Sequence, residues 1–294
     1  MEILVFGAGS LGSLVGGLLA RAHDVTLVGR DPHIGRVREA GLRVTGAVEA
    51  TVNPDATTEP PAGADLAVVT VKAFDTDAAA DALSGVDLDC CLSLQNGMGN
   101  EATLAAVLDV PILAGTCTYG ARLTDPGVVA CTGVGEVVLG DRDGGTSETA
   151  ERVGTAFADA GLETAVADDM PRRLWEKLAV NAGINATTAL ARVENGALLD
   201  GPAYEVASDA ARETARVARD EGVALGDEEA VAAVERVAEA TAANRSSMLQ
   251  DVEAGRRTEV DAISGFVAEH GASTPVNTTA ARLLRAWERG RGLR

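Results

Sequence analysis

Lysine is nearly missing from this chain of 294 residues. Only Lys72 and Lys177 are lysines among 25 basic residues, and all the others are arginines. The difference matters because a lysine can give up its proton at accessible pH, whereas an arginine cannot. A lysine kept in such a chain is therefore a candidate for acid–base chemistry.

Basic charge and long apolar runs are scarce as well. The net charge of −19 argues against nucleic acid or an anionic membrane surface as a partner. No apolar run approaches the length of a membrane span, and Met1-Glu2 leads straight into a predicted strand, which leaves no signal peptide. These observations predict a soluble, cytoplasmic protein.

Aromatic residues make up only 3% of the chain, and its many acidic residues are dispersed rather than gathered in a tail. Together with the scarcity of lysine, this composition is typical of halophilic proteins. In molar salt the Debye length is about 3 Å, so the self-repulsion of an acidic surface is screened. A merely acidic mesophilic protein is the alternative.

The few cysteines and histidines do not indicate a metal site or a disulfide framework. There is no C-x-x-C pair, and the cysteines fall in strand-like apolar runs, so we expect them to be buried small side chains. The histidines are far apart and lack metal-ligand spacing, and we expect no metal. The residues in question are Cys90, Cys91, Cys117 and Cys131, and His23, His33 and His270.

The N-terminus has the pattern of a dinucleotide-binding turn. The apolar run 3–6 predicts a buried strand, and residues 13–21 predict a helix of small residues. Between them lies Gly7-Ala8-Gly9-Ser10-Leu11-Gly12. In this context Gly7 makes the tight turn, Gly9 lets the backbone approach a pyrophosphate, and Gly12 allows close packing of helix and strand. The helix N-terminus would offer N–H groups to the phosphates.

The second predicted strand, 25–28, ends in Gly29-Arg30-Asp31. Enzymes that use NAD usually place an acidic residue at this point, to bind the ribose 2′-hydroxyl. Arg30 instead suits a 2′-phosphate, so the sequence favours NADPH. Asp31 next to it leaves NADH as the alternative.

Further strands are predicted at 66–71, 91–94, 112–118, 128–131, 137–139 and 164–166, with Gly120 and Gly133–Gly135 as turns. Lys72 and Asn96 follow two of these strands and should lie at the cofactor's edge, because ligands of open α/β sheets bind at the carboxyl ends of the strands. The pattern predicts a doubly wound, mostly parallel α/β Rossmann domain over residues 1–168. Residues 169–294 should form an all-α domain.

The helical half contains one polar stripe. Helices are predicted at 171–190, 202–221, 227–242, 244–254, 258–270 and 275–289, with Gly222 and Gly271 as C-terminal caps and Pro202 and Pro275 in first turns. Within the first helix, Lys177, Asn181 and Asn185 recur every fourth residue, with Thr188 beside them. The rest of that helix is apolar or small, and buried polar groups are costly unless paired. The stripe is either a solvated face or a site that uses the lysine.

A second segment of interest runs from Asn244 to Asp261. On one straight helix Asn244 and Glu259 would stand about 22 Å apart, too far to touch one small substrate. Gly255 and the pattern Thr258-x-x-Asp261 predict a break followed by a capping box. Glu259 would then lie in the first turn of a new helix. It is either a capping carboxylate or one that reaches a site.

With these residues in view, the chain resembles the ketopantoate reductases (2-dehydropantoate 2-reductases) over its full length. The resemblance rests on the glycine motif, on Val71-Lys72, on Gln95-Asn96-Gly97, on Trp175-Glu176-Lys177-Leu178-x-x-Asn181, on Glu194-Asn195-Gly196, and on two blocks at 246–251 and 258–261. It implies a Rossmann domain and a helical domain with the active site between them.

The resemblance also implies roles for residues already singled out. Lys177 would be the general acid, and Glu259 the carboxylate that orients or tunes it. Lys72 and Asn96 would lie beside the nicotinamide and the substrate. The amide and hydroxyl positions around the substrate would be Asn96, Asn181, Asn185, Asn195, Asn244 and Ser247.

The implied function is NADPH-dependent reduction of 2-dehydropantoate to (R)-pantoate, a step towards pantothenate and coenzyme A, by a monomer or homodimer. One alternative is a reductase of another small 2-keto acid with the same machinery. Another is a non-catalytic NADP-sensing protein, which would need the glycines but neither Lys177 nor Glu259.

Overall fold

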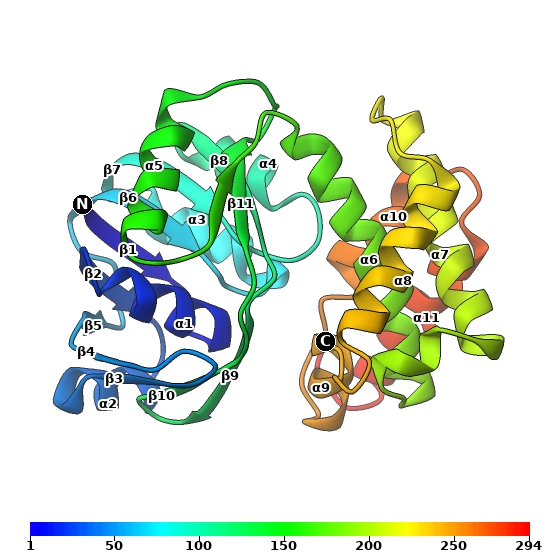
Figure 1. The fold of residues 1–294 in the computed structure, drawn as a ribbon, viewed down its shortest axis with the longest axis horizontal. Helices are drawn as coiled ribbons and strands as arrows, with labels where there is room; N and C mark the ends of the chain where they lie inside the picture. The colour runs from blue at the N-terminus through cyan, green and yellow to red at the C-terminus, as the bar shows by residue number, and fades with distance from the viewer. The chain divides into compact units, whose positions relative to one another are not determined.

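The computed structural model describes all 294 residues, which form two compact units (Figure 1). The first contains residues 1–95 and 99–170. The second contains residues 171–294 together with the three residues 96–98. None of the helices combines the length and the apolar character needed to cross a membrane.

The first unit is built on an eight-stranded sheet of order β12-β11-β8-β7-β6-β1-β2-β5. Six neighbouring strands run parallel, while β11 pairs antiparallel with β8 and brings β12 with it. The strands are β1 (Glu2–Phe6), β2 (Asp24–Val28), β5 (Asp55–Thr57), β6 (Gly63–Val69), β7 (Asp87–Ser93), β8 (Ile112–Cys117), β11 (Val137–Asp141) and β12 (Thr164–Val166). This is the expected Rossmann-type, mostly parallel sheet, because the long apolar runs of the sequence became its buried strands.

Helices connect these strands and cover the sheet: α1 (Ser10–Leu19), α2 (His33–Ala40), η1 (Ala73–Asp75), α3 (Thr76–Leu83), α4 (Asn100–Val107) and α5 (Glu148–Asp159). The strand order reverses at β1, which has β2 on one side and β6 on the other. Such a switch point is where open α/β sheets bind ligands.

A second sheet, with the order β4-β3-β10-β9, lies against α1 and was not predicted as a sheet. Its strands are β3 (Leu42–Gly46), β4 (Ala50–Val52), β9 (Gly120–Asp125) and β10 (Val128–Gly133). The turns predicted at Gly120 and Gly133 are wrong, because Gly120 begins β9 and pairs with Gly133, the last residue of β10. The β9 sequence is too polar to stand out as a strand on its own.

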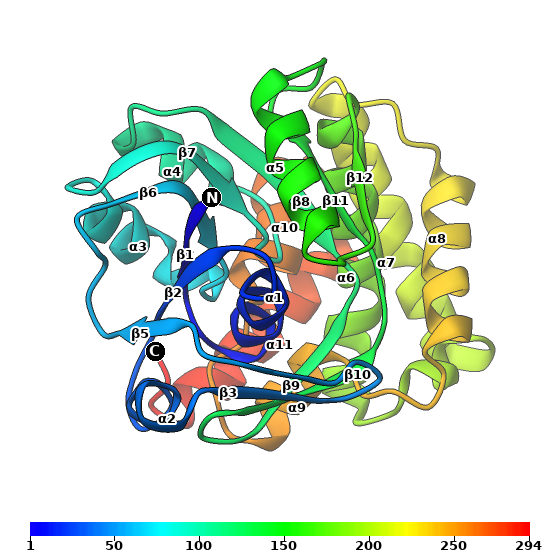
Figure 2. The ribbon, with the colours of Figure 1, turned by 60° about the vertical axis from the view of Figure 1, so that its left-hand side comes forward.

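Two adjacent glycines let α1 fit between the two sheets (Figure 2). A Cβ on Gly16 would lie 2.4 Å from Leu27 of β2, and a Cβ on Gly17 would lie 2.9 Å from Leu42 of β3. Larger residues would push the helix away from one sheet or the other. Both sheets therefore set the position of α1.

The buried side chain of His33 connects several segments of the first unit. Its Nδ1 accepts a hydrogen bond from the backbone N–H of Gly127 (3.0 Å), which leaves Nε2–H to donate to Ser13 Oγ (3.0 Å). The neutral imidazole thus joins α2 to α1 and to the β9–β10 turn. Burial lowers the pKa of His33 below its usual value of 6.5.

This lowered pKa should make the protein less stable as the pH falls. Below pH 6.5 the unfolded chain takes up a proton at His33 that the folded chain resists, so the free energy of unfolding falls by up to about 1.4 kcal/mol per pH unit until the folded pKa is passed. Urea unfolding between pH 8 and pH 5.5 measures this slope. His33→Gln should flatten it, whereas His270→Gln keeps His33 and should keep the slope. Equal slopes in wild type and His33→Gln would contradict the assignment.

The second unit is helical, as expected. It comprises α6 (Met170–Ala191, from Pro171 on), η2 (Asn195–Leu198), α7 (Gly201–Asp220), α8 (Asp227–Ala240), α9 (Ser247–Glu253), the π-helix η3 (Asp261–Gly265), α10 (Phe266–His270) and α11 (Pro275–Arg289). Gly183 lets α6 pack closely on its neighbours, because a Cβ there would lie 2.9 Å from the carbonyl of Ala207 in α7 and 3.0 Å from Val234 in α8.

The predicted helix ends are right in part. Pro202 and Pro275 lie in first turns, and Gly222 follows α7 with a left-handed φ of 84°. Gly271 ends α10 with an extended backbone instead (φ −99°), because the chain turns at once towards α11. The break after Gly255 is present, but the predicted capping box is wrong, as the geometry around Thr258 shows below.

Candidate active site and cofactor loop

The glycine loop sits at the switch point of the first unit. Gly7 has φ 110°, and its N–H and that of Ala8 both donate to the carbonyl of Val28 at the end of β2 (2.9 and 2.8 Å). A Cβ on Gly7 would lie 2.7 Å from the backbone nitrogen of Val71, and one on Gly12 would lie 2.3 Å from the carbonyl oxygen of Gly7. The protein's own packing therefore requires both glycines.

Gly9 differs from these two. A Cβ there would have the Gly7 carbonyl oxygen at 3.8 Å as its nearest neighbour, and the φ of −82° is one that any residue can adopt. Packing within the protein thus does not require a glycine at this position. The surface beside Gly9 can receive a ligand's phosphate group, at the helix end where backbone N–H groups lack helical partners.

The rest of the motif fixes α1. Ser10 begins the helix, and its Oγ accepts a hydrogen bond from Leu123 N (3.0 Å) in the second sheet. Leu11 is half-buried and packs against the core of the unit. The loop is thereby attached to both sheets.

At the end of β2, Arg30 is 89% exposed in its side chain and lies 3.4 Å from Asp75. The carboxylate of Asp31 accepts the backbone N–H of Gly35 (2.8 Å) and so closes the first turn of α2. Asp31 is therefore engaged in its own helix, while the guanidinium of Arg30 is accessible to a ligand.

Lys72 immediately precedes η1, in a loop fastened by side chains that the sequence did not single out. Gln95 Nε2 donates to the carbonyl of Val71 (3.1 Å) and to Thr76 Oγ1 (2.7 Å). The Thr76 hydroxyl lies 2.9 Å from Asn100 Oδ1. This buried network ties together the loops that follow β6 and β7. The one feature of the sequence that could have indicated this network is the position of Gln95, directly before Asn96.

Asn96, Gly97 and Met98 belong to the second unit. The backbone N–H of Met98 donates to the carbonyl of Ala262 in the π-helix (3.0 Å), and a Cβ on Gly97, which has φ 84°, would lie 2.5 Å from the Ala262 side chain. The backbone that follows Asn96 is thus in contact with the helical turn that follows Glu259.

The polar stripe of α6 has the predicted helical register. Lys177 and Asn181 are half-buried, and Asn185 is 6% exposed. Thr188 is fully buried and hydrogen-bonded to Ser246 Oγ (2.7 Å). The buried Nδ2 of Asn181 has no partner in the protein, which makes it available to a ligand.

The segment around Asn244 adjoins Asn195. The Asn195 backbone N–H donates to the carbonyl of Asn244 (3.0 Å), and its side-chain Nδ2 donates to Thr241 Oγ1 (2.8 Å), while its buried Oδ1 has no protein partner. Asn244 and Ser247 are exposed. Ser246, which was not among the predicted site residues, is buried and caps α9 through Leu249 N (3.1 Å).

Glu259 is 5% exposed and lies just before the π-helix rather than in a new helix. Asp261 does not close a capping box on Thr258, because its carboxylate pairs with Arg285 (2.7 Å) and Arg294. Burial alone would raise the pKa of Asp261, but the hydrogen bonds from these two arginines outweigh it and lower that pKa overall.

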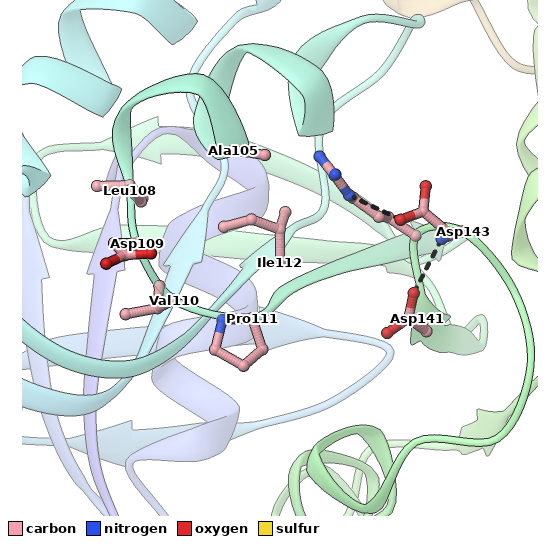
Figure 3. Close-up of a pocket in the computed structure, with 9 residues that line it drawn as sticks. Ala105, Leu108, Asp109, Val110, Pro111, Ile112, Asp141 and Asp143 are labelled. Carbon is pink, nitrogen blue, oxygen red and sulfur yellow. Dashed lines mark hydrogen bonds and ion pairs between the residues drawn. The ribbon is translucent and has the colours of Figure 1, made fainter.

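A cavity of about 450 Å³ lies elsewhere in the first unit (Figure 3). It is lined by the end of α4, the start of β8 and the end of β11, including Pro111 and Asp143. Because β11 runs antiparallel to β8, this is the amino-terminal edge of the parallel strands, opposite to the glycine loop. The cavity is therefore not the cofactor site.

Two family models match this chain, one over most of the first unit and one over most of the second. The family model described as "Ketopantoate reductase PanE/ApbA" matches residues 3–144, and its C-terminal counterpart matches residues 169–288. A 2-dehydropantoate 2-reductase of Halobacterium salinarum is 46% identical and covers 98% of this chain and 99% of its own. One from Archaeoglobus fulgidus is 42% identical, with 98% of each chain covered.

Solved structures share the fold. A PanE/ApbA family ketopantoate reductase from Ralstonia eutropha JMP134 superposes with a TM-score of 0.91 at 32% identity, covering 99% of this chain and 100% of that one. A D-mandelate dehydrogenase in ternary complex with NADH and anilino(oxo)acetate superposes with a TM-score of 0.93 at 25% identity, covering all of both chains.

Proposed function

Because the chain belongs to the ketopantoate reductase family, we propose that it reduces 2-dehydropantoate to (R)-pantoate with NADPH, on the route to pantothenate and coenzyme A. The observation that supports this most directly is the α6 stripe. There, a chain with only two lysines places Lys177 one turn from the Asn181 amide, whose buried Nδ2 is left for a ligand. Neutral amides suit a substrate with hydroxyl, ketone and carboxylate groups.

The first unit has the features that a dinucleotide needs. Gly7 and Gly12 shape the turn, Gly9 leaves space for a pyrophosphate, and the N-terminus of α1 faces it. Arg30 would pair with the 2′-phosphate, since it is exposed and the neighbouring Asp31 is engaged with Gly35. Bound NADPH supplies the hydride for C2 of the keto acid.

Lys177 acts as the general acid in this proposal. Its ammonium donates a hydrogen bond to the C2 carbonyl oxygen, stabilises the negative charge that develops there, and transfers a proton to give the hydroxyl. Solvent then returns a proton to the Lys177 amine. Glu259 orients the ammonium and favours its charged form. Asn96, Asn181, Asn185, Asn195, Asn244 and Ser247 bind the remaining polar groups of the substrate, and Lys72 lies at the nicotinamide edge.

Replacing Arg30 with aspartate should invert the cofactor preference. It removes the guanidinium proposed to bind the 2′-phosphate, and a charged hydrogen bond of about 1.5–3 kcal/mol corresponds to a loss of about 10- to 100-fold in kcat/KM for NADPH. Asp75→Asn is the matched control, because it breaks the ion pair with Arg30 but keeps the guanidinium. An unchanged ratio of kcat/KM values for NADPH and NADH in Arg30→Asp would contradict the proposal that Arg30 binds the 2′-phosphate.

A second candidate substrate is another 2-keto acid. It is favoured by the fold shared over the full chain with D-mandelate dehydrogenase. Oxidation of NADPH in molar salt, measured with 2-dehydropantoate and with a panel that includes the keto acid corresponding to mandelate, separates the two. We expect the highest kcat/KM with 2-dehydropantoate. Preference for another keto acid would replace the substrate but keep the machinery. NADPH binding without turnover on any of them would favour a sensor.

A further inference from the structure

Glu259 lies on a short irregular stretch of chain. Helix α9 ends at Glu253, and the π-helix begins only at Asp261. A carboxylate that orients another side chain must itself be held in one place. Since no helix or strand contains Glu259, the restraint has to come from other groups.

One such restraint is a buried carboxylate on α11. Oε1 of Glu288 accepts hydrogen bonds from both the backbone N–H of Thr258 (2.7 Å) and its hydroxyl (2.6 Å). The same hydroxyl accepts the backbone N–H of Val260 (3.3 Å). The residues on either side of Glu259 are thus fixed through one side chain, which lies 30 positions away in the sequence.

The network continues past Glu259. Oε2 of Glu288 accepts a hydrogen bond from Arg294 Nε (2.5 Å), and the same guanidinium reaches Asp261, the first residue of the π-helix. One charged cluster therefore holds the chain before and after Glu259. Glu288 is fully buried, with these donors as its compensation.

A purely stabilising role would not need a charge at this position. The buried residues of α11 are Asn277, Ala281, Leu284 and Glu288. Glu288 is the last of this buried stripe, and an apolar residue could take its place there. Replacing buried ionic groups with apolar ones is often neutral or stabilising. The buried Glu288 carboxylate is therefore better explained by a role in fixing the local backbone geometry around Thr258.

We propose that Glu288, acting through Thr258, is the positioning residue that holds the Glu259 carboxylate in place for catalysis. This inference rests on the proposed function, in which Glu259 orients Lys177. It assigns a role to a residue that does not itself touch the substrate or the cofactor.

The test compares two substitutions of the buried Thr258. Thr258→Val keeps the shape and the backbone N–H but removes the hydroxyl that links Glu288 to Val260. We expect kcat with 2-dehydropantoate to fall about 10- to 100-fold, because small displacements of catalytic groups have effects of this size. The Kd for NADPH should not change. Thr258→Ser restores the hydroxyl and should restore most of kcat.

The pH profile separates positioning from simple destabilisation. The alkaline limb of kcat reports the acid in the enzyme–substrate complex. A displaced Glu259 favours the charged lysine less, so in Thr258→Val this limb should move to lower pH by about one unit. Glu213→Gln is the matched control. Glu213 is a second buried glutamate, which accepts the N–H groups of Val276 (2.8 Å) and Asn277 (2.9 Å) at the other end of α11. Glu213→Gln should lower Tm without changing kcat or the limb.

Wild-type kcat and an unmoved limb in folded Thr258→Val would overturn the proposal while leaving the proposed function intact. If Thr258→Val does not fold, Glu288→Gln provides the same test, because its amide would face Arg294 and weaken the hold on Thr258. Unchanged kinetics in that variant would overturn the proposal equally. Failure of the proposed function looks different, since wild type itself would then not reduce 2-dehydropantoate.

Discussion

Replacing Lys177 with alanine should lower kcat for 2-dehydropantoate by about 10²- to 10⁴-fold, the usual contribution of general acid–base catalysis. The variant would lose both the proposed proton donor and the positive charge proposed to stabilise the developing alkoxide. NADPH should still bind with nearly wild-type affinity, because the glycine loop, Arg30 and Lys72 all belong to the other unit. Steady-state kinetics together with a direct NADPH titration measure both quantities.

Two substitutions sharpen this experiment. Lys177→Arg keeps a positive charge but cannot release a proton, so it should recover little of the lost kcat if proton transfer is the main contribution. Arg172→Ala removes a different cation from α6, one that pairs with Glu176 and Glu229 at the surface, and should leave kcat unchanged. Turnover by Lys177→Ala close to that of wild type would exclude the general-acid role.

Gly9→Asp should have opposite effects on cofactor binding and on stability. A Cβ at this position would make only an ordinary contact with the Gly7 carbonyl oxygen (3.8 Å), and an aspartate at the N-cap can accept the first N–H groups of α1, so stability should hold or rise by about a few tenths of a kcal/mol. The same carboxylate would occupy the position that we propose for the pyrophosphate and would repel its negative charge. We expect NADPH affinity to fall by more than about 100-fold, or about 2.7 kcal/mol.

Gly12→Ala is the informative contrast to Gly9→Asp. Its Cβ would lie 2.3 Å from the Gly7 carbonyl oxygen and 2.4 Å from Thr70 Oγ1, so the turn and the helix must move apart. This variant should lose stability and NADPH affinity together. Thermal unfolding with and without NADPH distinguishes the two variants. Undiminished NADPH affinity in Gly9→Asp would mean that the cofactor does not lie against this loop.

All strands of the large sheet except β5 could be predicted, and the clearest signal was the continuous apolar run that burial on both faces leaves, as in β1 and β6. The short polar edge strand β5 was missed. In the small sheet only β10 was predicted, as a strand over 128–131. Strand β9 begins at a glycine and is mostly polar, and its pairing with β10 becomes favourable only when Val129 of β10 joins the core of the unit. The interactions that define it come from distant residues.

The candidate site, too, could be predicted only in part. The register of the α6 stripe follows from helical periodicity alone, so Lys177, Asn181 and Asn185 could be grouped from the sequence. The capping box predicted at Thr258 is absent, which shows the limit of prediction from local sequence patterns. A local pattern offered Asp261 as the partner of Thr258. Instead Glu288 accepts the Thr258 N–H, and Asp261 pairs with three arginines, Arg257, Arg285 and Arg294. Nothing near position 258 in the sequence reveals the hydrogen bond to Glu288.

The paired glycines of α1 limit how small a working cofactor-binding fragment of this chain can be. Gly16 of α1 packs against the large sheet and Gly17 against the small sheet, so a fragment trimmed to the large sheet would expose the face of α1 that the small sheet covers. The small sheet is therefore part of the unit that we propose to bind the dinucleotide. A transplant of this unit into another protein must include β3, β9 and β10 along with the glycine motif.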